Sequence, residues 1–229
     1  MESVYYPPIC DIEDLEHLAE GSEFTATTKD SGRVYDCPNG MRYPSVTTVI
    51  GLKTREHIKA WRSRVGEEKA NRITAGASRR GTRMHDLYET YLRAEEEVVF
   101  KNPLEREMFE CIAPVLNEIT PIALEAPLWS EELEMAGRVD CIGILNGELS
   151  IIDFKTSSKH KDGNHVGQYF LQETAYSMMV KELTGEQPSQ LVTIVAIEGG
   201  YSQMFVSEPF GYIDELKELR NRYRKLYGF

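Results

Sequence analysis

Several features that mark large classes of proteins are scarce in this sequence. Among its 229 residues there are four cysteines, and no two of them form a C-x-x-C pair; they are Cys10, Cys37, Cys111 and Cys141. This spacing argues against zinc ribbons, iron–sulfur clusters and a disulfide framework, and we expect four reduced thiols. No uninterrupted apolar run approaches the roughly 20 residues that a membrane-spanning helix needs. Internal repeats and low-complexity tracts are also missing.

Basic residues are absent from the beginning of the chain. No lysine or arginine precedes Lys29, whereas secretory signals and mitochondrial presequences carry basic residues near their N-terminus. The sequence therefore predicts a cytoplasmic protein with no membrane association. With 41% hydrophobic and 28% charged residues, the composition is that of an ordinary globular protein rather than a disordered one. This length favours a single domain with a core of useful size.

The net charge of −11 excludes a protein that holds nucleic acid by bulk positive charge. The charge is nevertheless unevenly distributed. Between Lys53 and Arg83 the chain has ten basic and three acidic residues, a local charge of +7 that leaves −18 for the remainder. Such a run is either a solvated helix surface or a footprint for a polyanion, and a phosphate-directed site nearby would favour the footprint.

Hydrophobic periodicity predicts a chain that passes from helices to strands and back. Residues 1–50 are expected to form an irregular, hairpin-bearing segment with a turn at Pro38-Asn39-Gly40. Helices are predicted at residues 47–72, 79–92, 103–119, 166–183 and 212–227. Strands are predicted at residues 122–129, 134–145, 148–156, 191–198 and 201–207.

The dipeptide Asn146-Gly147 predicts a two-residue β-hairpin turn. If Leu145 pairs with Glu148, counting back along both strands places Asp140 opposite Asp153, with the Lys155 side chain on the same face. Two carboxylates and an ammonium on one face are suited to divalent-metal phosphate chemistry. A plain salt bridge between Lys155 and one aspartate is the alternative, and a bulge would shift the register.

Four short motifs follow one another in a fixed order. Gly81-Thr82-Arg83-Met84-His85 opens a helix, and it is followed by Gly137-Arg138-Val139-Asp140, Ile152-Asp153-Phe154-Lys155-Thr156 and Gln172-Glu173-Thr174-Ala175-Tyr176. Together they resemble the PD-(D/E)XK nuclease superfamily, within it the RecB-like exonucleases. The resemblance is strongest to the mitochondrial genome maintenance exonuclease type and its phage relatives, whose Pro-Ser-Val-Thr segment is matched by Pro44-Ser45-Val46-Thr47.

This resemblance implies an α/β (α+β) fold with a restriction-endonuclease-like core. A mixed central sheet of about five strands is expected, flanked by helices, with residues 51–229 as the nuclease domain and residues 1–50 as an N-terminal extension. It also implies a metal site for Mg²⁺ or Mn²⁺ made by Asp140, Asp153, His85 and the main-chain carbonyl of Phe154. Lys155 would orient or activate the attacking water. Gln172 and Tyr176 are one helical turn apart, so both can face the sheet and contact the phosphate or its water.

The expected activity is metal-dependent hydrolysis of DNA, most simply of single-stranded DNA from a free end. The expected DNA contacts are Lys59, Arg62, Arg72, Arg79, Arg80, Arg83 and Thr156. A nuclease for double-stranded 5′ ends or special DNA structures, and a binding module without catalysis, are the alternatives. Some related nucleases carry a four-cysteine iron–sulfur cluster, which is not expected here because no cysteine follows Cys141. Glu125 is a further acidic residue whose strand face the sequence does not predict.

Overall fold

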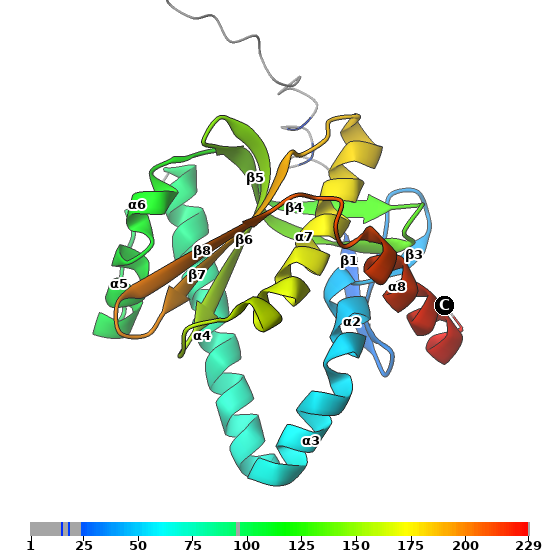
Figure 1. The fold of residues 1–229 in the computed structure, drawn as a ribbon, viewed down its shortest axis with the longest axis horizontal. Coiled ribbons are helices and arrows are strands. Elements are labelled where there is room, and N and C mark those ends of the chain that lie inside the picture. Colours follow the sequence, from blue (N-terminus) through cyan, green and yellow to red (C-terminus); the bar gives the residue numbers. More distant parts are fainter. Residues whose placement is uncertain (1–14, 16–17, 19–23, 95–96, 229) are drawn as a thin grey trace, which may run out of the picture.

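A five-stranded sheet lies at the centre of the protein, in a computed structural model that describes residues 24–94 and 97–228 together with Leu15 and Leu18 (Figure 1). The strands are β4 (Ile119–Ser130), β5 (Met135–Leu145), β6 (Glu148–Ser157), β7 (Gln190–Ile197) and β8 (Tyr201–Ser207), and they lie in that order across the sheet. Neighbouring strands are antiparallel except β6 and β7, which are parallel and joined by helix α7 (Gly163–Thr184). The predicted mixed sheet of about five strands flanked by helices is confirmed.

Helices cover both faces of this sheet. On one face, α7 packs with α2 (Val46–Ile50) and α8 (Ile213–Tyr227). On the other face lie α4 (Glu67–Arg93), α5 (Pro103–Glu110) and α6 (Ala113–Leu116). The helix that hydrophobic periodicity predicts at residues 79–92 lies within α4, and its apolar residues Met84, Leu87 and Tyr88 are buried against the sheet. No helix in the described part of the chain combines the length and apolar character needed to cross a bilayer.

The N-terminal segment forms a second, smaller sheet. Its strands are β1 (Thr25–Lys29), β2 (Gly32–Asp36) and β3 (Arg42–Pro44), and the predicted turn lies between β2 and β3, where the Gly40 amide donates to the Cys37 carbonyl. Tyr35 and Tyr43 pack against Ala136 of β5. Cys37, Cys111 and Cys141 are free thiols, as expected, whereas Cys10 lies outside the described residues.

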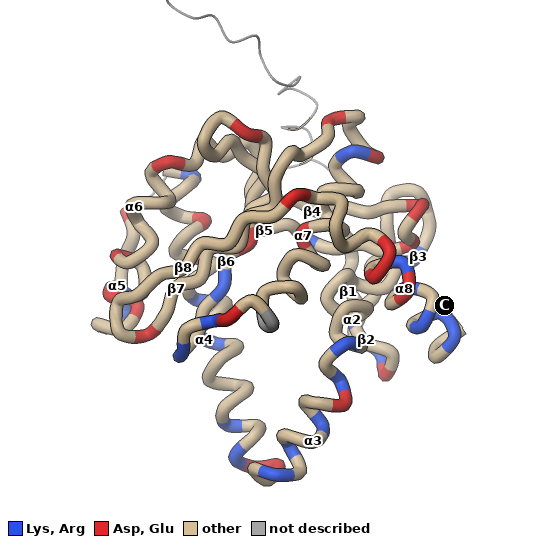
Figure 2. Tube along the Cα trace, in the orientation of Figure 1, with Lys and Arg blue, Asp and Glu red and all other residues tan. Residues whose placement is uncertain are grey.

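Helix α3 (Arg55–Val65) and the first half of α4 form a projecting helical hairpin, which we define as residues 55–79 (Figure 1). Ala70 is its one buried residue, and lysines and arginines occur along both of its arms (Figure 2). The predicted boundaries were wrong here. The short η1 turn (Gly51–Lys53) separates α2 from α3. The next helix boundary is at Gly66, between α3 and α4, where the φ of 87° favours glycine. Helix α4 then continues through Gly76 without interruption.

The helix predicted over residues 103–119 was also too long. Its proline begins α5, as expected, with the Asn102 side chain accepting from the Glu105 amide. The helix ends at Glu110, and a single turn of α6 follows before β4 begins at Ile119. The apolar residues of this segment pack in the core beside α4. A helix followed by a short turn buries them as well as one continuous helix would.

The Asn146-Gly147 turn forms as predicted. Both residues have positive φ, 55° and 81°, which a type I′ turn requires. Leu145 pairs with Glu148, and the ladder runs in the predicted register to the pair of Cys141 with Ile152. This hairpin brings the two predicted aspartates to the place where the ladder ends.

Candidate active site

A pocket of about 520 Å³ lies beside the end of the β5–β6 ladder. The α4 segment from Gly81 to Glu89 forms one wall, and residues of β2, the start of α2, β4, β5, β6 and α7 form the others. The predicted site residues that line it are His85, Asp140, Lys155, Gln172 and Tyr176, with Glu125 beside them. Segments more than 90 residues apart in sequence therefore converge on one cavity.

Asp140 is placed differently from the simple hairpin prediction. The ladder stops one pair earlier, and beyond Cys141 the Asp140 carboxylate Oδ2 accepts the main-chain N–H of Phe154 at 2.9 Å. The same oxygen lies 3.5 Å from His85 Nδ1 of α4. Asp140 is therefore oriented toward the α4 side rather than paired directly with Asp153. The main chain of Phe154, predicted to offer its carbonyl, contacts Asp140 through its amide.

Glu125 joins His85 and Asp140 in a cluster of three possible metal ligands. One donor atom from each lies within 4.8 Å of the other two. Glu125 has a φ of 51°, an uncommon conformation for a residue other than glycine, and it interrupts the regular pairing of β4 with β5. An imidazole nitrogen and two carboxylate oxygens form a donor set that suits a divalent cation. The residues present fit the metal that the sequence motifs predict.

The electrostatics of this cluster also favour a cation. Burial, with Asp140 and Glu89 nearby, raises the pKa of Glu125 to about 7. Burial opposes protonation of His85, but the charge of Asp140 outweighs it and raises the histidine pKa to about 9. Burial likewise opposes ionisation of Asp140, yet His85 holds the pKa of this carboxyl below its usual value. The cluster thus attracts positive charge, and protonation of His85 would compete with binding of a metal ion.

Asp153 and Lys155 form the second part of the site. Asp153 is 1% exposed, and its Oδ2 forms an ion pair with Lys155 Nζ while its Oδ1 accepts from Gln172 Nε2 at 2.9 Å. Burial raises the pKa of Asp153 to about 6 in spite of the lysine. Burial disfavours the charged form of Lys155, but Asp153 and Asp140 together raise its pKa above the usual value. The Lys155–Asp153 salt bridge, which the sequence offered as the alternative to a site, therefore forms among the predicted site residues.

Gln172 and Tyr176 lie one turn apart on α7, and both face the sheet as predicted. The Tyr176 ring packs against Gly137, where a Cβ atom would come within 2.8 Å of the ring and its hydroxyl. Burial, with Asp140 and Asp153 nearby, raises the pKa of the Tyr176 phenol, so the group is a neutral donor at physiological pH. Glycine at position 137 therefore leaves room for the tyrosine, because a Cβ atom there would force the ring to shift.

The lysines and arginines among the predicted DNA contacts divide into those with an ion-pair partner and those without one in the described residues. Arg62 binds Glu67, Arg72 binds Glu68, Arg80 binds Glu198 and Arg83 binds Glu105. Lys59 and Arg79 have no ion-pair partner within the described part of the chain. The Thr156 hydroxyl lies beside Gly81 of α4, next to the pocket. The simple charge count thus overstates the free positive charge of the helical hairpin, although exposed pairs such as Arg72–Glu68 are weak and exchange readily with phosphate.

Comparison with known proteins assigns the fold to a family. The family model described as the PD-(D/E)XK nuclease superfamily matches residues 52–226 of this chain. The chain belongs to this superfamily. It is 30% identical over 129 residues to mitochondrial genome maintenance exonuclease 1 of Homo sapiens and of Mus musculus. These matches cover 52% of this chain and 38% of each relative, so the chain corresponds to well under half of the relatives' length.

A solved structure of a putative exonuclease from Eubacterium rectale is also similar. It is 12% identical, the match covers 64% of both chains, and the TM-score is 0.42.

Several residues that line the pocket of this PD-(D/E)XK chain, or lie buried behind it, were not identified from the sequence. Arg33 and Tyr35 of β2 line it, although no motif marks them, because the small N-terminal sheet brings them there. Glu173 is fully buried behind Asp153 and Lys155, with one carboxyl oxygen bound to the Thr193 hydroxyl. Burial and the charge of Asp153 raise the pKa of Glu173 well above its usual value. Only its place inside the Gln172–Tyr176 motif pointed toward the site.

Replacing Glu125 with glutamine should stabilise the metal-free protein at alkaline pH. Below pH 4.5 the carboxyl is protonated in both the folded and the unfolded state, so it does not affect stability. Between pH 4.5 and about 7 only the unfolded state ionises, and above this range the folded state keeps the cost of a buried charge. Allowing for partial exposure, we expect a gain of about 1–2 kcal/mol in the free energy of unfolding at pH 8.

Urea unfolding in the presence of a chelator, at pH 4.5 and pH 8, measures this difference. The exposed Glu118→Gln is the control and should change stability equally at both pH values. With a saturating divalent metal the order should reverse, because wild type then gains a ligand that the variant lacks. An equal effect of Glu125→Gln at the two pH values in the chelator would show that Glu125 is not a desolvated carboxyl.

Proposed function

We propose that this protein is a divalent-metal-dependent deoxyribonuclease that hydrolyses phosphodiester bonds from a free end, with single-stranded DNA as its substrate. The observation that carries the proposal is the convergence of two groups in one pocket. The His85–Glu125–Asp140 cluster faces the same cavity as Lys155, which is paired with Asp153. The pocket adjoins α4 just above the helical hairpin, where the free and weakly paired cations lie.

Mg²⁺ or Mn²⁺ would be held by His85, Glu125 and Asp140, and by Asp153 with the Phe154 carbonyl as the family resemblance implies. When bound, such an ion would supply polarisation of the scissile phosphate and a lowered pKa of water. Lys155 orients that water and stabilises the negative charge that develops on the phosphate. Gln172 keeps Asp153 in place through its 2.9 Å hydrogen bond. The neutral Tyr176 hydroxyl is available as a donor to a phosphate oxygen.

The helical hairpin is suited to following a DNA backbone. Lys59 and Arg79 offer unpaired charges within the described residues, and Arg62 and Arg72 are paired with the exposed Glu67 and Glu68. In this proposal residues 51–229 form the nuclease domain, and residues 1–50 are an extension that contributes Arg33 and Tyr35 to one side of the pocket. A cytoplasmic location and the absence of an iron–sulfur cluster stay part of the proposal.

Digestion of matched linear and circular single-stranded DNA tests this function. With Mg²⁺ or Mn²⁺ present we expect loss of the linear substrate, protection of the circle, and no cleavage of either in a chelator. Cleavage of circles would refute the requirement for a free end. Faster cleavage of double-stranded 5′ ends or of branched DNA would favour the alternative nuclease classes, and binding without cleavage of any substrate would identify a non-catalytic module.

A further inference from the structure

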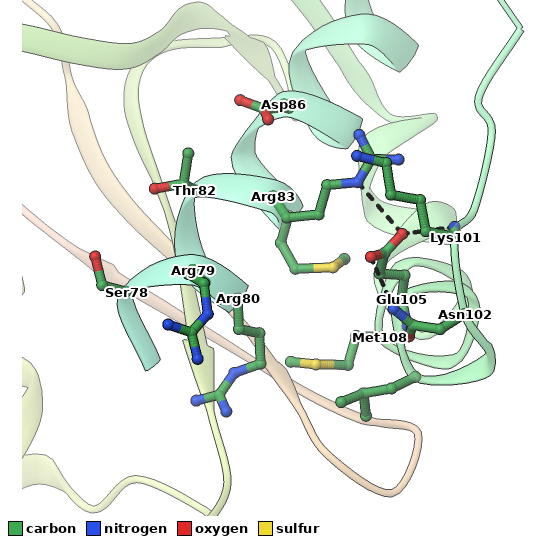
Figure 3. A pocket seen from close by; sticks show the side chains of 12 residues that line it. Ser78, Arg79, Arg80, Thr82, Arg83, Asp86, Lys101, Asn102, Glu105 and Met108 are labelled. Atoms are coloured by element: carbon green, nitrogen blue, oxygen red, sulfur yellow. Dashed lines mark hydrogen bonds and ion pairs between the residues drawn. The ribbon is translucent and has the colours of Figure 1, made fainter. Parts of the chain in front are cut away.

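A second pocket, of about 540 Å³, lies between α4 and the start of α5 (Figure 3). Its volume is within the range of sites that enclose small ligands. It adjoins the candidate active site, because Thr82 and Asp86, one turn apart on α4, line both cavities. A chain leaving the active site over this turn of α4 would enter the second pocket directly. Arg79, Arg80 and Arg83 of its lining are among the predicted DNA contacts, and none of its residues has a predicted catalytic or metal-binding role.

Cations surround this pocket on the sides of both helices. Arg79, Arg80 and Arg83 come from α4, and Lys101 precedes α5 (Figure 3). Together with two acidic residues, Asp86 and Glu105, they leave the lining with an excess of positive charge. The pocket is therefore suited to an anionic ligand.

Several of these charges are fixed before any ligand arrives. Glu105 accepts from Arg83 Nε at 3.3 Å and from the Lys101 amide at 2.8 Å, which ties α4 to the start of α5. Arg80 is anchored by Glu198 at 2.6 Å, and its Nε is buried without a hydrogen-bond partner among the described residues. Arg79 is exposed and has no ion-pair partner in that same part of the chain. The lining thus combines a preorganised frame with donors that are still available.

The floor of the pocket is apolar. Met84 and Met108 are fully buried, and Leu104 is 40% exposed at the edge. Thioether and aliphatic side chains pack against flat aromatic groups, and guanidinium planes stack on the faces of such aromatic groups. An apolar floor beside arginines and a lysine matches a nucleobase together with its phosphate. A base that is paired in a duplex cannot turn its face into such a pocket, whereas an unpaired base can.

We propose that this second pocket binds one unpaired nucleotide of the same DNA strand that is cut in the active site. The base rests on Leu104, above the buried Met84 and Met108, and the phosphate meets Arg79 and Lys101. The proposal rests on the proposed function, because it assigns the pocket a part of that substrate. It gives a physical reason for a preference for single strands, which the active site alone does not supply.

Binding of single-stranded oligonucleotides that lack one base at successive positions tests this pocket. Fluorescence anisotropy would be recorded with the Lys155→Met variant so that the DNA stays intact. We expect loss of one particular base, or of two neighbouring bases, to weaken binding about fivefold, with smaller effects elsewhere. Leu104→Ser should flatten this profile, and the Arg79→Ala/Lys101→Ala double variant should weaken binding of every oligonucleotide.

Arg106→Ala is the matched control, because Arg106 is an exposed cation on the same helix as Leu104 and lies outside the second pocket. It should keep the position-dependent profile. A flat profile in the Lys155→Met background, or a profile that Leu104→Ser leaves unchanged, would overturn the proposal. If wild type digests DNA but the profile is flat, the pocket assignment alone fails. If the profile is present but wild type cuts no DNA, hydrolysis fails and the pocket assignment stands.

Discussion

Replacing Lys155 with methionine should lower the rate of DNA hydrolysis by about 10³-fold, because the change removes the only described cation in contact with Asp153. Methionine preserves much of the length and apolar volume of the lysine stem. Lys155 lies inside the pocket rather than on the helical hairpin, so DNA affinity should change by less than about threefold. Single-turnover hydrolysis and fluorescence anisotropy measure the two quantities separately.

Stability has to be considered in this variant. Asp153 is buried, and removing its cation leaves an uncompensated carboxylate that favours protonation or unfolding. The Asp153→Asn/Lys155→Met double variant removes both charges and should recover most of the lost thermal stability without recovering hydrolysis. The exposed Lys159→Met, just beyond β6, is the control for a lysine lost from the same segment. Unchanged turnover in a folded Lys155→Met protein would show that Lys155 has no part in the chemistry.

Replacing Asp140 with asparagine is expected to have an effect of similar size through a different route. Asparagine keeps an oxygen that can accept the Phe154 amide, so the end of the β5–β6 ladder should survive. It removes the charge that the His85–Glu125–Asp140 cluster offers to a cation. We expect divalent-metal affinity to fall by about tenfold or more and hydrolysis to fall by about 10³-fold.

Calorimetric titration with Mn²⁺ and the thermal shift that Mn²⁺ produces measure the loss of metal binding directly. In wild type the metal displaces the proton of His85, whose pKa is about 9, so affinity should increase as the pH rises toward that value. The control is Asp214→Asn in the exposed first turn of α8. Wild-type metal affinity in Asp140→Asn, measured where the variant is folded, would remove Asp140 from the metal site.

Local signals made part of this site predictable from the sequence. The Asn146-Gly147 turn determines the register of β5 and β6, so the position of the Asp140 and Asp153 strands could be counted outward from it. The helical spacing of Gln172 and Tyr176 likewise predicted that both face the sheet. These predictions succeeded because a two-residue turn and a helical repeat leave few alternative geometries.

Longer-range features were not predictable in the same way. Glu125 approaches Asp140 only because β4 has a register shift between Pro121 and Ala123 and a left-handed residue at position 125. A four-residue loop connects β4 to β5, so no two-residue turn determines the register between these two strands. The helix break at Gly66 rather than Gly76 is a similar case, since either glycine permits a break and tertiary context selects one.

The most direct test of this account is to locate the metal. Crystals of the Lys155→Met variant grown with Mn²⁺ and a single-stranded oligonucleotide would be measured at the manganese absorption edge. We expect an anomalous peak within coordination distance of His85, Glu125 and Asp140, with a DNA phosphate on its open side. The absence of a peak there at saturating Mn²⁺, or a peak coordinated by none of these three side chains, would contradict the proposed metal site.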